Sequence, residues 1–176
     1  MRPKPTTNYL AGYDPALVHN VRQLIDQNRL AEILLKKYPQ AHAVRTDKAL
    51  YDYVQEIKGE YLRNTGQLSL VAFDSTMHII RNALGTHTRI SRVQGTRLKA
   101  KREIRVATMF KAMPPEFLRM IVVHELAHLR EGNHDKDFYQ LCQHMEPDYH
   151  QLEFDLRVYL SHLDTTGQAL WSPTAL

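Results

Sequence analysis

The sequence predicts an α+β fold in which a small, mostly antiparallel sheet packs on one central helix, with further helices at both ends. Apolar residues recur at helical spacing over residues 13–65, and the period shortens to that of strands over 68–110. Helical spacing returns over 115–163. At 176 residues, a single domain is the default.

The N-terminal third is expected to form amphipathic helices. Asp14-Pro15 is a helix-start signal, since the carboxylate caps the first turn and proline fits the first helical position. The helical pattern that follows is interrupted once and ends at Tyr38-Pro39. Thr46-Asp47 opens another helix, for which Gly66 is the expected stop.

The middle of the chain contains short segments of alternating or β-branched residues, separated by Asp, Ser, Asn and Gly. Such spacing is typical of strands joined by turns, so we expect a mostly antiparallel sheet. The four expected strands are 68–73, 77–80, 88–93 and 104–110.

Pro114-Pro115 starts the most regular helix of the chain, which is expected to end near Gly132. Two more helical stretches follow, over 136–145 and 147–163. The predicted organisation is therefore a flexible arm (1–12), one domain (13–165) and a tail (166–176).

Composition excludes several classes of protein. The single cysteine, Cys142, excludes an internal disulfide and indicates a reducing compartment. Apolar runs such as Met120–Val123 are far shorter than the roughly 20 residues of a membrane span. Because no apolar segment follows the basic N-terminus, we expect a cytoplasmic protein without a secretory signal.

Histidines cluster near the C-terminal end, with five of ten lying between residues 124 and 150. Two of them belong to the H-E-x-x-H pattern His124-Glu125-Leu126-Ala127-His128. Residues four apart share one face of a helix, so both imidazoles can reach one cation. With ten histidines and nine glutamates, chance predicts only about 0.03 such patterns in the chain.

A third ligand must follow the helix. His134 is the preferred candidate, because Gly132 lets the chain turn back toward the metal; Glu146 and Glu153 are the alternatives. Three protein nitrogens with one open position are typical of catalytic zinc, although other divalent metals also bind imidazole. Glu125, rotated away from the two ligands, is then placed to accept a proton from water as the catalytic base.

The segment Ile121–Leu129, together with Asn133-His134, Phe138 and Pro147-Asp148-Tyr149, resembles the YgjP-like family of metal-dependent hydrolases. That family belongs to the zincin-like metallopeptidase group, so the resemblance implies a zincin-like fold. Its members include metallopeptidases and a UTP pyrophosphatase. Carried over residue by residue, the resemblance implies His124, His128 and His134 as metal ligands and Glu125 as the catalytic carboxylate.

The positive charge of the chain is local. Nine basic residues and one acidic residue lie between 81 and 111, which gives this strip +8 and leaves −4 for the remainder. On a strand, Arg97, Lys99 and Lys101 project to one face, so they are candidates for binding phosphate groups. The alternative is a solvated outer sheet face that discourages edge pairing.

Three functional hypotheses follow. The first is a zinc-dependent metallohydrolase of the metallopeptidase type, which binds a peptide along an edge strand at 104–109. The second is a nucleoside triphosphate (UTP) pyrophosphatase that uses the same metal site, with the basic strip 81–111 holding the phosphates. The third, a nucleic-acid-associated protein, lacks the interleaved aromatic residues that stack on bases.

Overall fold

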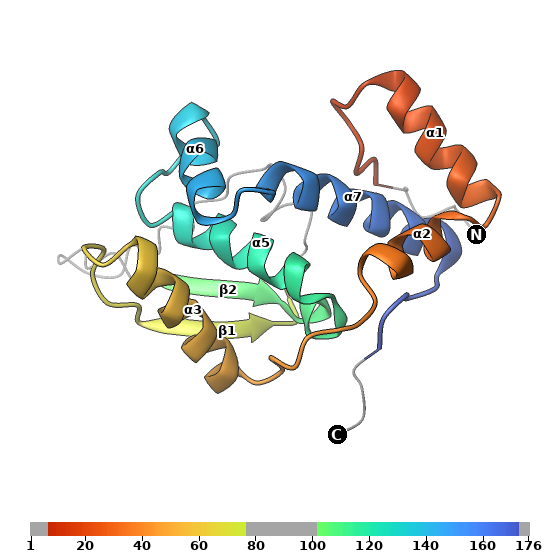
Figure 1. The fold of residues 1–176 in the computed structure, drawn as a ribbon. Coiled ribbons are helices and arrows are strands. Elements are labelled where there is room, and N and C mark those ends of the chain that lie inside the picture. Colours follow the sequence, from red (N-terminus) through yellow and green to blue (C-terminus); the bar gives the residue numbers. More distant parts are fainter. Residues whose placement is uncertain (1–6, 77–101, 173–176) are drawn as a thin grey trace.

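The computed structural model describes residues 7–76 and 102–172, and Figure 1 shows their arrangement. The helices and strands, in chain order, are α1 (Pro15–Asp26), α2 (Leu30–Lys37), α3 (Asp47–Tyr61), β1 (Leu70–Asp74), β2 (Glu103–Ala107), a 3₁₀ helix (Thr108–Ala112), α5 (Pro115–Ala127), α6 (Lys136–Met145) and α7 (Tyr149–Thr166). This arrangement confirms the small α+β fold. No helix in the described ranges has the length and apolar character needed to span a bilayer.

Helix α5 is the central element of the fold. It contacts β2 and α3 on one side and α6 and α7 on the other, as Figure 1 shows. Nine of its thirteen residues are buried, including Phe117, Val122 and Leu126. A helix that is apolar on every side needs neighbours all round, which explains why this segment lies inside the molecule.

Side-chain caps account for the predicted helix starts. The Asp14 carboxylate accepts hydrogen bonds from the amides of Ala16 and Leu17, at 2.9 and 3.2 Å. The Thr46 hydroxyl accepts one from the amide of Ala49 at 3.1 Å. Each cap satisfies amide groups that have no partner within the helix, so both helices begin where the sequence predicts.

The expected antiparallel pairing is wrong for the two described strands. β1 and β2 run parallel, from Leu70 beside Glu103 to Asp74 beside Ala107. The 28 residues between the strands are enough for the crossover connection that a parallel pair requires. The strands expected at 77–80 and 88–93 lie outside the described residues.

Two element ends also differ from expectation. The strand expected to reach residue 110 ends at Ala107, and a 3₁₀ helix takes the chain into α5. Helix α5 ends at Ala127 rather than near Gly132, and the chain continues as a turn in which the amides of Leu129 and Arg130 bond to carbonyls three residues back, both at 3.0 Å. Backbone amides therefore make this turn, five residues before the glycine.

One tyrosine, Tyr38, joins distant parts of the chain. The Tyr38 hydroxyl donates a hydrogen bond to the Asp155 carboxylate at 2.6 Å, and its ring packs on Phe117 at a centroid distance of 4.8 Å. Its carbonyl accepts a hydrogen bond from the indole of buried Trp171 at 2.7 Å. The end of α2, the start of α5, α7 and the C-terminal segment therefore meet at one residue.

Candidate metal centre

Three imidazoles converge at the C-terminal end of α5. The Nε2 atoms of His124 and His128 lie 3.2 Å apart, and that of His134 lies 3.1 Å from the first and 3.0 Å from the second. His124 is buried, while the other two are partly buried. The structure therefore brings together the three residues that the sequence singles out, in a group that could hold a metal ion.

The distances between these three nitrogen atoms test whether they could bind one metal ion together. A tetrahedral zinc ion with Zn–N bonds of about 2.0–2.1 Å separates its nitrogen ligands by about 3.3 Å. The observed separations of 3.0–3.2 Å are close to that value. The three nitrogens therefore fit one small divalent cation.

The hydrogen bond on the far side of His128 determines which ring nitrogen can bind a metal. Its Nδ1 lies 3.0 Å from the carbonyl oxygen of Glu131. A carbonyl oxygen only accepts, so Nδ1 carries the proton and donates it, which leaves the Nε2 lone pair directed at the cluster. This contact forms because α5 ends at Ala127, and the turn that follows places the Glu131 carbonyl beside the imidazole of His128.

Tyr149 performs the same role for His124. Its hydroxyl, at the start of α7, lies 2.7 Å from Nδ1 of the imidazole, and the whole side chain is buried. The hydroxyl also interacts with the thiol of Cys142, whose pKa burial raises to about 12. When the hydroxyl oxygen accepts a hydrogen bond from Nδ1–H, the Nε2 lone pair of His124 is directed at the cluster, as in His128.

The third histidine is positioned by the start of α6. His134 immediately precedes Asp135, whose carboxylate caps this helix by accepting the Phe138 amide at 3.2 Å. The Phe138 ring is fully buried and packs against all three imidazoles, with centroid distances of 4.6–4.9 Å. This ring therefore forms an apolar wall behind the cluster and limits the movement of each imidazole.

Glu125 lies next to the cluster on α5. Its side chain is partly buried, and desolvation raises its pKa to about 8 in the metal-free protein. A divalent cation held by the adjacent histidines favours the carboxylate form, because opposite charges at short range lower the pKa of an acid. The protonation state of this group is therefore coupled to metal occupancy.

The two alternative ligands are engaged elsewhere. The Glu146 carboxylate lies 2.6 Å from Nε of Arg119, and the Glu153 carboxylate lies 2.9 Å from an Nη of Arg157. Both pairs are largely shielded from solvent, which strengthens them. The predicted phosphate ligands Arg97, Lys99 and Lys101 lie outside the described residues.

Sequence reasoning missed the contacts of Phe138 and Tyr149 with the histidines. Both residues lie in the segments that carry the family resemblance, which is the one signal that could have found them. No spacing rule connects Tyr149 with His124, because the two are 25 residues apart on different helices. Their contact depends on how α7 packs against α5.

Comparisons with known proteins agree with this site. A family model described as YgjP-like, metallopeptidase domain, matches residues 72–159, which include β2, α5, α6 and all three histidines. A curated protein of Escherichia coli (strain K12) named UTP pyrophosphatase is 57% identical over 155 residues, covering 88% of this chain and 93% of the relative. No solved structure matches the chain.

These matches confirm two predictions made from the sequence. The first is that the protein is an enzyme of the metal-dependent hydrolase class. The second is its family, since the model covers half of the chain and the relative covers most of it. The chain therefore belongs to the YgjP-like family of metallopeptidase-type proteins.

Proposed function

We propose that this enzyme is a zinc-dependent nucleoside triphosphate pyrophosphatase that acts on UTP. The observation that carries the proposal is the 57% identity to a UTP pyrophosphatase over nearly the full length of both chains. The triangle of histidine nitrogens supports the metal part of the proposal, with His124, His128 and His134 as ligands. Zinc is favoured because all three ligands are imidazoles, whereas magnesium prefers oxygen ligands.

Glu125 is the proposed general base. Residues one apart on a helix are rotated by about 100°, so Glu125 faces the open side of the cluster rather than sharing the position of His124. When bound, the metal ion activates water and polarises the phosphoryl group to be attacked. The Glu125 carboxylate accepts a proton from the attacking water and returns it to the leaving group.

The proposed reaction consumes one water and one nucleotide. The water oxygen forms a bond to the α-phosphorus of UTP, and the bond from that phosphorus to the oxygen bridging to the β-phosphate breaks. Pyrophosphate leaves with the bridging oxygen, and UMP retains the oxygen from water. No redox partner or second substrate is needed.

Turnover of the zinc-loaded protein on UTP, with release of pyrophosphate as the readout, tests the proposal. Glu125→Gln should retain zinc and lose about 10²–10⁴-fold in kcat, the usual contribution of a general base. Glu32→Gln, an exposed carboxylate on α2, is the matched control and should keep wild-type activity. If Glu125→Gln retained more than a tenth of wild-type kcat, the assignment of the base would be wrong.

A second candidate function, peptide hydrolysis, is favoured by the metallopeptidase description of the matching family model. The same base and metal would then act on a carbonyl carbon. An unstructured peptide tested in parallel with UTP separates the two functions. Peptide cleavage that requires Glu125, without UTP cleavage, would replace the first proposal by the second.

A further inference from the structure

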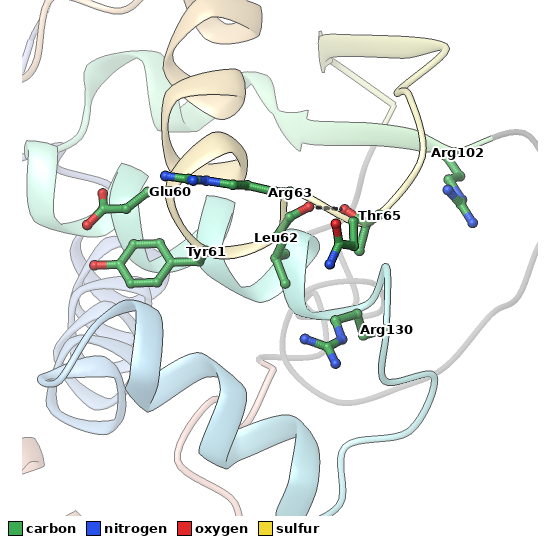
Figure 2. A pocket seen from close by; sticks show the side chains of 8 residues that line it. Glu60, Tyr61, Leu62, Arg63, Thr65, Arg102 and Arg130 are labelled. Carbon is green, nitrogen blue, oxygen red and sulfur yellow. Dashed lines mark hydrogen bonds between the residues drawn. The ribbon is translucent and has the colours of Figure 1, made fainter.

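A pocket of about 610 Å³ lies where the end of α3, the start of β2 and the turn after α5 meet (Figure 2). Arg102 lines it from the start of β2, and Arg130 lines it from the turn. Thr65, beside the end of α3, adds a polar side chain. The volume lies within the range of small-molecule sites in proteins.

The backbone holds Arg102 at the rim of this pocket. Its carbonyl accepts hydrogen bonds from the amide and the hydroxyl of Ser69, at 2.9 and 3.1 Å, which extends the pairing of the two strands by one residue. Its guanidinium lies across Gly66, where an added Cβ atom would collide with Nη1. The glycine therefore makes room for the arginine side chain.

The charges of the pocket are not balanced. Neither Arg102 nor Arg130 has a carboxylate partner in the part of the chain that the structure describes. By contrast, three other arginines pair with carboxylates: Arg105, Arg119 and Arg157. The pocket therefore presents two guanidinium groups that are available to an anion.

The lining carries three arginines, Arg63, Arg102 and Arg130, and one acidic residue, so its net charge is positive. Figure 2 shows the Arg63 side chain running back along α3 toward Glu60, the one acidic residue of the lining. Nε of Arg63 donates to the Gly59 carbonyl at 2.8 Å, and the Thr65 hydroxyl donates to that of Leu62 at 2.7 Å. These donors satisfy carbonyl groups that would otherwise make the end of α3 negative.

The pocket shares a chain segment with the candidate metal centre. Arg130 is the second residue after His128, and the next residue, Glu131, supplies the carbonyl that orients the His128 ring. The same turn thus contributes the Arg130 guanidinium to the pocket and orients the His128 ring through the Glu131 carbonyl. An anion bound to Arg130 would therefore contact the segment that also orients His128.

We propose that this pocket binds the phosphate groups of an oligophosphate substrate, with Arg102 and Arg130 as the donors. A guanidinium group matches phosphate because two parallel N–H groups reach two oxygens at once. The assignment to the substrate rests on the proposed function. The binding of phosphate itself does not, because it requires no turnover.

Calorimetric titration of the metal-free, full-length protein with inorganic pyrophosphate tests the pocket. Arg102→Gln and Arg130→Gln should each weaken binding at least tenfold, as expected for the loss of charge-assisted hydrogen bonds. Gly66→Ala keeps every charge but displaces the Arg102 side chain, so it should also weaken binding. Arg22→Gln, on the exposed face of α1, removes the same charge and should bind as the wild type.

Several results would overturn the proposal. Wild-type affinity in both Arg102→Gln and Arg130→Gln would exclude the pocket, and an equal loss in Arg22→Gln would show only a general charge effect. UTP should displace pyrophosphate from the wild type; if only inorganic triphosphate competes, the pocket does not serve the nucleotide. If pyrophosphate binds as expected but the zinc-loaded protein hydrolyses no nucleotide, the proposed function fails while the phosphate site stands.

Discussion

Replacing Tyr149 by phenylalanine removes one buried oxygen atom and leaves the ring that packs at the start of α7. The lost hydrogen bond is the 2.7 Å contact with Nδ1 of His124. In the metal-bound protein that nitrogen carries a proton, which is then buried without an acceptor. Loss of such a supporting partner typically lowers metal affinity 10–100-fold, which corresponds to about 1.4–2.7 kcal/mol.

We therefore expect Tyr149→Phe to bind zinc at least tenfold more weakly than the wild type, as measured by competition with a chromophoric chelator. Tyr159→Phe is the matched control, since this buried tyrosine lies on the same helix and packs against Trp171 rather than the histidines. The control should keep wild-type affinity for zinc. A folded Tyr149→Phe protein with wild-type affinity would refute the role of the hydroxyl.

Three further outcomes are expected. Burial lowers the pKa of His42 and His162, so below a pH of about 6.5 these two groups bind more protons in the unfolded chain than in the folded protein. In urea denaturation, the wild type should therefore lose free energy of unfolding relative to His42→Asn/His162→Asn as the pH falls from 7 to 5. Phe138→Ala should reduce the free energy of unfolding of the metal-free protein by about 3–5 kcal/mol, and a loss below 1 kcal/mol would contradict its packing. Zinc should raise the Tm of the wild type but not of His128→Ala; an equal rise in both would place the zinc elsewhere.

The features that could be predicted from the sequence are those set by local interactions. Asp14 caps α1 two and three residues away, and α6 covers the same residues, 136–145, that its pattern indicates. His124 and His128 meet because a helix brings residues four apart to one face. In each case the partner is within one turn, so the chain between them has little freedom.

The features that could not be predicted depend on long-range packing. Alternation of apolar residues indicates the two faces of a strand but not its direction relative to a neighbouring strand. The parallel pairing that places Val71 beside Ile104 could therefore not be predicted from it. The phosphate pocket likewise combines Thr65, Arg102 and Arg130 from three distant segments. The turn at Ala127 was missed because backbone amides make it and no side chain signals it.

The cluster around Tyr38 also has a consequence for the order of folding. Its partners Asp155 and Trp171 are 117 and 133 residues further along the chain. During synthesis, α1 and α2 leave the ribosome long before these partners exist, so the hydroxyl and the carbonyl of Tyr38 cannot form these two hydrogen bonds until nearly the whole chain has emerged. Contacts of such long range slow folding, and the nascent chain therefore depends on its last helix to complete its core.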